Sequence, residues 1–155
     1  MTSEKTEVLA KDVMTADPLC VPPSMTLREL VRTFEENEIS GVPVTDSQGR
    51  VVGIVTKSDV LRRFSKGTDE LPPAYLFEIL SEVADEEVSD DLHEPRFCVD
   101  DVMTEDPIMV PPTMPVGQVA REMFESRVHR VVVANAEKYP LGIITSMDML
   151  GVFPK

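Results

Sequence analysis

The residues whose types and spacing suggest chemistry occur twice, each time directly after a glycine and two β-branched residues. Thr56 is followed three positions later by Asp59, and Thr145 by Asp148. This spacing is typical of a capping box at the start of a helix, which requires no ligand. It also suits a nucleotide, because the free N–H groups of a helix start attract phosphate and a carboxylate accepts ribose hydroxyls. The motif alone leaves both interpretations open.

The two motifs belong to a longer internal repeat. At an offset of 89 positions, 19 of the 50 residue pairs between 12–61 and 101–150 are identical, and no gap is needed. The identities run from Asp12 with Asp101 to Leu61 with Leu150. A copy this complete predicts two equivalent structural units. Each unit alone would be marginally stable, so we expect the two to pack on each other.

Composition excludes several classes of function. The 155 residues carry a net charge of −13, which argues against binding to nucleic acid or to an anionic membrane. No apolar run has the length of a membrane span, and the N-terminus lacks the apolar core of a signal peptide. Cys20 and Cys98 have neither metal-ligand nor redox spacing, and His93 has no second ligand nearby. We therefore expect a reduced, cytoplasmic protein without a metal site.

The repeat divides the chain into four stretches. Residues 1–11 lead in, 12–61 form the first repeat, 62–100 connect, and 101–155 form the second repeat. Each repeat reads β-α-β-β-α, a mixed α/β (α+β) fold. The expected strands are 19–21, 42–44 and 51–55, with counterparts at 108–110, 131–133 and 141–144; final helices begin at Thr56 and Thr145.

The first helix of each repeat shows helical spacing of apolar residues opposite a charged face. Thr26 and Glu29 predict a capping box for the first of these helices, whereas the second has Pro115 at the place of Thr26. The apolar faces comprise Leu27, Leu30, Val31 and Phe34 in the first repeat, and Val116, Val119, Ala120, Met123 and Phe124 in the second.

The connecting stretch predicts one extra element. Leu76, Ile79, Leu80 and Val83 have helical spacing after Pro72-Pro73, so an amphipathic helix is expected there. Six acidic residues follow between 85 and 94. A run of this kind is typical of a solvated linker, with a dedicated partner site as the alternative.

Taken together, the repeated motifs resemble a tandem pair of CBS domains, which form a Bateman module. The resemblance covers about two-thirds of the chain and occurs twice in register. The matching segments are 13–15, 21–23, 39–46, Gly49, 52–56 and 59–61 in the first repeat, and 128–133, 141–145 and 148–150 in the second.

The resemblance implies two lobes related by a pseudo-two-fold axis, with clefts that bind adenosine-containing ligands such as AMP, ADP, ATP or S-adenosylmethionine. It also implies a homodimer. Carried onto this sequence, the first site comprises Thr15, Val42, Pro43, Thr56, Lys57 and Asp59. The second site comprises Thr104, His129, Arg130, Val131, Val132, Thr145 and Asp148.

The two predicted sites differ in charge. The second repeat has His129-Arg130 where the first has Ser40-Gly41, and similar His-Arg pairs meet phosphates in nucleotide-sensing members of the family. Arginine suits phosphate because its guanidinium donates two parallel hydrogen bonds. The first repeat offers Lys57 instead, at the place of Ser146. We therefore expect the second site to be the stronger phosphate site.

Three functions compete. The preferred one is a non-catalytic regulatory module that senses an adenosyl ligand and needs no cofactor. Its output is a separate partner, a change of assembly or sequestration of the ligand. A ligand-free dimerisation scaffold is the alternative, in which every Thr-x-x-Asp is only a cap. A nucleotide-processing enzyme is disfavoured because the sequence has no Gly-rich phosphate loop, nucleophile elbow or recognisable catalytic constellation.

Overall fold

The computed structural model describes residues 7–64 and 97–152. Contacts divide the chain into two compact units that do not coincide with the two repeats. Unit 1 contains the described residues of Met1–Leu19, Gly49–Val51 and Pro107–Lys155, and unit 2 those of Cys20–Gln48 and Val52–Asp106. Each unit therefore combines most of one repeat with the leading segment of the other.

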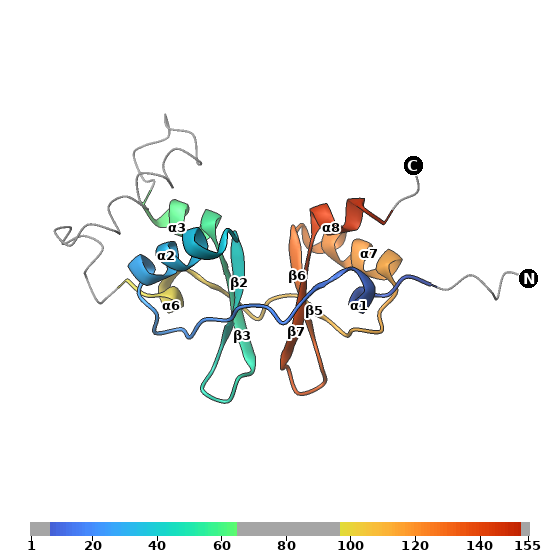
Figure 1. The fold of residues 1–155 in the computed structure, drawn as a ribbon, viewed down its shortest axis with the longest axis horizontal. Coiled ribbons are helices and arrows are strands. Elements are labelled where there is room, and N and C mark those ends of the chain that lie inside the picture. Colours follow the sequence, from blue (N-terminus) through green and yellow to red (C-terminus); the bar gives the residue numbers. More distant parts are fainter. Residues whose placement is uncertain (1–6, 65–96, 153–155) are drawn as a thin grey trace, which may run out of the picture. The chain divides into compact units, whose positions relative to one another are not determined.

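Unit 2 is a three-stranded sheet covered by helices on one side (Figure 1). The strand order is β2-β3-β4, and β3 pairs antiparallel with β4 so that Ile54 lies opposite Thr104. The strands are β2 (Gly41–Thr45), β3 (Val51–Thr56) and β4 (Thr104–Glu105), and the helices are α2 (Leu27–Asn37), α3 (Lys57–Phe64) and α6 (Val99–Val102).

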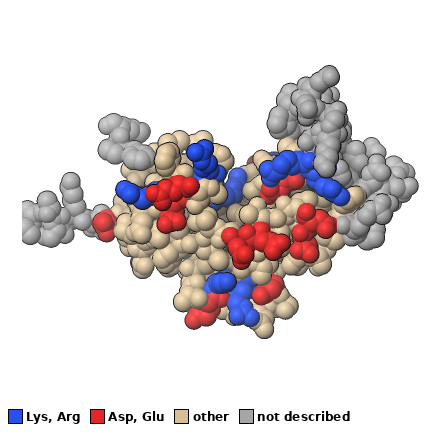
Figure 2. Space-filling view, turned by 180° about the vertical axis from the view of Figure 1, so that it is seen from behind, with Lys and Arg blue, Asp and Glu red and all other residues tan. Residues whose placement is uncertain are grey.

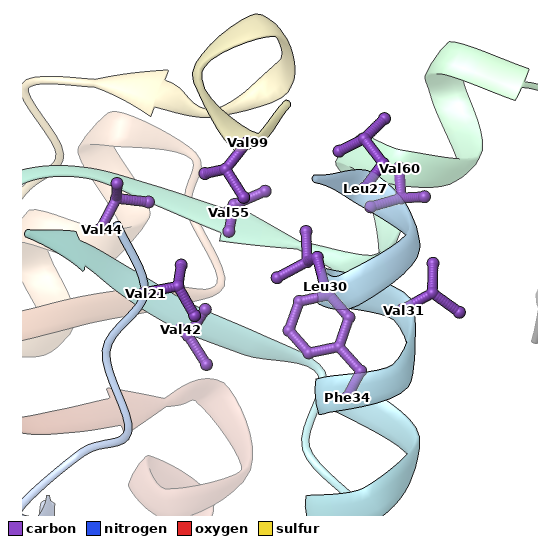
Figure 3. Packing of buried hydrophobic residues seen from close by; sticks show 10 residues of the cluster. All are labelled: Val21, Leu27, Leu30, Val31, Phe34, Val42, Val44, Val55, Val60 and Val99. Carbon is purple, nitrogen blue, oxygen red and sulfur yellow. The ribbon is translucent and has the colours of Figure 1, made fainter. Parts of the chain in front are cut away.

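The core of unit 2 lies between these helices and the sheet (Figure 3). Leu30 and Phe34 of α2 are fully buried, as the helical spacing predicts. Val99 of α6 points toward Val55 of β3, so the segment that leads the second repeat completes the core of the first. The predicted capping box of α2 is confirmed, since Thr26 and Glu29 each accept the other's backbone N–H.

Unit 1 repeats this plan with one more strand. Its sheet has the order β1-β7-β6-β5, in which β6 and β7 are antiparallel and β5 and β6 are parallel. The elements are α1 (Ala10–Val13), β1 (Thr15–Ala16), β5 (Met109–Val110), α7 (Val116–Ser126), β6 (Arg130–Ala134), β7 (Pro140–Thr145) and α8 (Ser146–Leu150).

Two glycines allow the leading segments to dock. A Cβ on Gly142 would lie 2.4 Å from the Met14 sulfur and 2.9 Å from the Thr15 carbonyl oxygen. A Cβ on Gly53 would similarly lie 2.7 Å from the Met103 sulfur and 2.9 Å from a backbone oxygen. Only glycine lets the leading strand approach this closely. The sequence preserves both glycines in register but does not reveal which strand each one faces.

The structure confirms the mixed fold with two repeats and corrects some details. Phe124 was expected on the buried face of its helix, but it is 84% exposed. Eight residues after Val116, it lies about 80° around the helix from that residue and so leaves the apolar stripe. The first expected strand is reduced to one bridge between Val21 and Val44. The expected extra helix and the acidic run lie outside the described residues.

Candidate functional site

The first Thr-x-x-Asp motif forms where β3 ends and α3 begins. The backbone N–H of Thr56 donates to Oδ2 of Asp59 at 2.8 Å, and the N–H of Asp59 donates to the Thr56 hydroxyl oxygen at 3.2 Å. The Thr56 hydroxyl also donates to the same Oδ2, at 3.0 Å. The capping box is therefore complete, and it occupies one carboxylate oxygen together with the threonine proton.

Arg62 occupies the remaining carboxylate oxygen. Its guanidinium forms an ion pair with Oδ1 of Asp59, one helical turn away in α3. Asp59 is only 7% exposed, whereas Arg62 lies largely in solvent. Both oxygens of the first motif's carboxylate therefore already accept bonds from within the chain, and the Arg62 guanidinium competes with a ribose hydroxyl for Oδ1.

The second motif is built in the same way but is left open. The N–H of Thr145 donates to Oδ2 of Asp148 at 2.8 Å, and the N–H of Asp148 donates to the Thr145 hydroxyl oxygen at 3.2 Å. Among the described residues, no group bonds to Oδ1 of Asp148, and the Thr145 hydroxyl donates to none. The residue that corresponds to Arg62 is Gly151. A carboxylate oxygen and a hydroxyl proton are thus available together.

His129 lies beside this open motif. Its backbone carbonyl accepts the N–H of Ser146 at 2.8 Å and the Ser146 hydroxyl at 3.2 Å, which ties the start of β6 to the start of α8. The His129 side chain is exposed, and Arg130 follows it half-buried. A pocket of about 580 Å³ opens here within unit 1, lined by Met123, Phe124, Glu125, Arg127, Val128, His129 and Ser146.

The first repeat has an ion pair in the equivalent place. Nζ of Lys57 lies 3.8 Å from a carboxylate oxygen of Glu35, and these residues correspond to Ser146 and Phe124 of the pocket. Lys57 was predicted as a ligand contact of the first site. In the structure it links α3 to α2 instead of standing alone.

The predicted apolar contacts lie on the second strand of each repeat. Val42 and Pro43 are buried in β2, and Val131 and Val132 are buried in β6. Val42 and Val131 belong to the cores between helices and sheet, whereas Pro43 and Val132 alternate with them along the strands and point to the other face of each sheet. Pro43 of β2 and Val132 of β6 occupy equivalent places in the two strands although their residue types differ.

Thr15 and Thr104, which begin the short strands β1 and β4, each lie in the compact unit that holds most of the other repeat. Thr15 was assigned to the first site, but it pairs with Ile143 of β7, in the unit that holds Thr145 and Asp148. Thr104 was assigned to the second site, but it pairs with Ile54 of β3, in the unit that holds Thr56. The structure therefore groups each threonine with the other repeat's motif. The cause is the exchange of leading segments.

Sequence reasoning missed Arg62. The comparison of the repeats ends at Leu61 and Leu150, one position before Arg62 and Gly151 diverge. An arginine three residues after an acid on a helix is a recognisable pairing signal. Extending the alignment by one residue would have identified the difference.

Surface charge and metal-ligand groups were compared over the part of the chain that the structure describes. Acidic and basic side chains form separate small groups on the face in Figure 2, without a continuous basic surface there. Residues 7–64 and 97–152 contain no group of three or more His, Cys, Asp or Glu that could hold a metal, and no helix in these ranges could cross a membrane. Burial raises the pKa of the Cys20 thiol, and burial with nearby Asp101 raises the pKa of Cys98.

Known proteins have similar sequences. Uncharacterized protein MJ1426 of Methanocaldococcus jannaschii is 31% identical over 151 residues, which cover 92% of this chain and 89% of that protein. An inosine-5'-monophosphate dehydrogenase of the same organism is 28% identical over 93% of this chain, which spans only 22% of the enzyme.

Solved structures of low sequence identity have the same fold. The CBS domain pair of protein MJ0100, in complex with 5'-methylthioadenosine and S-adenosyl-L-methionine, superposes with a TM-score of 0.72 at 20% identity, covering 96% of this chain and 97% of that one. CBSX2 in complex with AMP superposes with a TM-score of 0.66 at 23% identity, covering 92% and 93%. Residues 10–66 and 99–155 each match the sequence profile of the CBS domain. The chain therefore belongs to the CBS domain family and carries two copies of the domain.

Proposed function

We propose that this protein is a non-catalytic regulatory module that binds an adenosine-containing ligand, with its stronger site at Thr145 and Asp148. Chains of the same fold hold 5'-methylthioadenosine, S-adenosyl-L-methionine or AMP. The related dehydrogenase spans far more residues than the part that this chain matches. The match to that enzyme therefore gives no support to a dehydrogenase activity in this chain.

The open carboxylate of Asp148 carries the proposal. A ribose presents two neighbouring hydroxyls, and an acidic residue that accepts them is the usual way to recognise it. Oδ2 of Asp148 is held by Thr145, which fixes the orientation of the carboxylate and leaves Oδ1 to accept. Capping alone requires only one oxygen, so the second is available for a ligand.

The surroundings of this site favour an anionic group on the ligand. His129 and Arg127 line the neighbouring pocket, and Arg130 begins the adjacent strand. The two arginines support AMP, ADP or ATP over an adenosine compound without phosphate, because a guanidinium donates charge-assisted hydrogen bonds to phosphate. The module would act in the cytoplasm on a separate protein and would need no further cofactor.

A thermal-shift panel tests the proposal. The protein is freed of nucleotide and melted with AMP, ATP, S-adenosylmethionine and 5'-methylthioadenosine. A ligand at about 100 times its Kd stabilises the folded state by about 2.7 kcal/mol, which is several degrees of melting temperature. If all four compounds leave the melting temperature unchanged, the scaffold alternative holds and the sensor function fails.

Matched variants locate the site. Asp148→Asn retains the size of the side chain but removes the charge, and it should abolish the shift. Asp59→Asn makes the same change in the closed motif and should leave the shift intact. Sustained release of ADP or AMP from ATP and Mg²⁺, lost in Asp148→Asn, would instead identify an enzyme.

A further inference from the structure

The start of β3 contacts the turn between β6 and β7, and both belong to unit 1 (Figure 1). This turn, residues 135–139, leads into β7. The backbone N–H of Val51 donates to the Lys138 carbonyl oxygen at 2.8 Å. A Cβ on Gly49 would lie 3.6 Å from a ring carbon of Tyr139, so the ring lies against the bare glycine. These two contacts are here called the clasp.

The clasp is held firmly from both sides. Val51 is 3% exposed, so opening the bond would leave a buried N–H group unpaired, which is costly. On the other side, Oδ1 of Asn135 accepts two backbone N–H groups of the turn, at 2.9 and 3.0 Å. The N–H of Lys138 donates to the Asn135 carbonyl oxygen at 2.9 Å. The turn is therefore fixed around the carbonyl that Val51 contacts.

The clasp is one-sided although the two repeats have equivalent turns. Gly49 and Lys138 keep the offset of 89 positions, and both have a left-handed backbone, with φ of 85° and 73°. The counterpart of Val51 is Pro140, which has no N–H and cannot donate to the Gly49 carbonyl. Glycine adopts the left-handed conformation without strain, whereas lysine does not. Residues strained in this way cluster at ligand clamps and switch regions.

Two strands lead from the clasp to the two Thr-x-x-Asp motifs. β7 begins directly after Tyr139 and ends at Thr145. β3 begins at Val51 and ends at Thr56, so each strand spans about 17 Å between the clasp and a motif. β3 also crosses between the compact units, since Val51 belongs to unit 1 and the strand from Val52 onward to unit 2. Rigid elements of this kind carry a restraint from one end to the other.

We infer that the clasp couples the second motif to the first repeat, so that a ligand held at Thr145 also steadies Thr56. The bound ligand restrains the end of β7, the clasp passes the restraint to Val51, and β3 carries it to the first motif. The inference rests on the proposed function, because it requires a ligand at Thr145 and Asp148. In this coupling the first repeat, whose motif is closed by Arg62, responds to the ligand instead of binding it.

Amide hydrogen exchange followed by NMR tests the inference, with the nucleotide-free full-length chain and AMP as the probe. The signal to follow is the Thr56 N–H, which donates to Oδ2 of Asp59 at the far end of β3. AMP should slow its exchange about fivefold or more, the lower end of the usual coupling between two sites. Asp148→Asn removes the proposed ligand contact and should abolish the slowing. Slowing that persists in Asp148→Asn would mean that AMP acts on the first motif directly, which would overturn the inference.

Variants of the clasp separate coupling from binding. Asn135→Ala removes the side-chain bonds that fix the turn, and Tyr139→Ala removes the ring from the clasp. Each should still bind AMP but lose most of the slowing at Thr56. Lys138→Gly is the matched control, because it keeps the carbonyl that accepts from Val51 and adopts the left-handed backbone without strain. It should retain the slowing.

Isothermal titration with AMP distinguishes the two ways in which the inference can fail. An absence of binding in the wild type would overturn the proposed function and the coupling with it. Binding without a response at Thr56, or with an equal response in both alanine variants, would overturn the coupling alone. Circular dichroism confirms that each variant is folded, and the two alanine variants act independently if one of them does not fold.

Discussion

The two repeats have the same backbone and differ in the side chains around their Thr-x-x-Asp motifs. Both repeats have a residue with left-handed backbone conformation at two equivalent places. Asp17 and Asp106 follow the short strands β1 and β4, and Glu38 and Arg127 follow the helices α2 and α7. Each of these pairs keeps the offset of 89 positions, although the second pair differs in residue type. The conformation is therefore set by position in the fold rather than by side-chain chemistry.

The difference lies in what closes each motif. Both motifs use a threonine and one aspartate oxygen as a cap. In the first repeat, Arg62 pairs with the motif's own Asp59, and Lys57 pairs with Glu35 nearby. In the second, Gly151 leaves the carboxylate open and Phe124 leaves an apolar ring exposed. The polar groups of the first repeat are bonded within the chain, whereas those of the second are left exposed.

The largest expected effect tests what the repeats share. Gly142→Ala should lower the free energy of unfolding by about 2–3 kcal/mol, because its Cβ would overlap the Met14 sulfur and a backbone oxygen that cannot rotate away. Gly53→Ala should cost about the same. Urea denaturation measures both, with Gly151→Ala as control because its Cβ would make only an ordinary contact at 3.5 Å. A loss confined to one of the two strand glycines would contradict the equivalence.

The sequence predicts where helices and strands lie better than it predicts which strands pair with each other. Alternation and capping residues locate β3, β7 and the start of α2 to within a residue, because each depends on local chemistry. The docking of Thr15 and Thr104 on the other repeat's strands was not predictable, since a two-residue strand carries no periodicity. The unequal sites were partly visible in His129 against Ser40, whereas the role of Arg62 required the observed ion pair.

Closing the open site is the next strongest test. Gly151→Arg places a guanidinium where the first repeat has Arg62, and Gly151 has an ordinary right-handed conformation that accepts a side chain. The arginine should pair with Oδ1 of Asp148 and weaken ligand binding about 10- to 100-fold, the loss of one charged hydrogen bond. Isothermal titration with AMP measures it against Gly151→Ala. Unchanged affinity would mean that Oδ1 does not meet the ligand.

The reverse change should open the first site. Arg62→Ala frees Oδ1 of Asp59 while leaving the capping bonds of Thr56 in place. Binding at this motif should tighten about tenfold, so that titration reveals a second ligand per chain. Arg63→Ala, one position further along α3, is the control and should leave the stoichiometry at its wild-type value. A single site in Arg62→Ala would show that more than the arginine separates the repeats.

The smallest effect concerns the helix starts. Thr26 caps α2 through its hydroxyl, whereas Pro115 starts α7 without a side-chain bond. Thr26→Ala should lower the free energy of unfolding by about 1 kcal/mol. Pro115→Thr adds a cap with Gln118 at the position of Glu29, but it also releases backbone freedom in the unfolded chain, at a cost of about 0.4–1 kcal/mol. The two terms should nearly cancel in urea denaturation. A clear gain would show that the second helix start lacks only the hydroxyl, whereas a clear loss would show that proline stabilises it by rigidity.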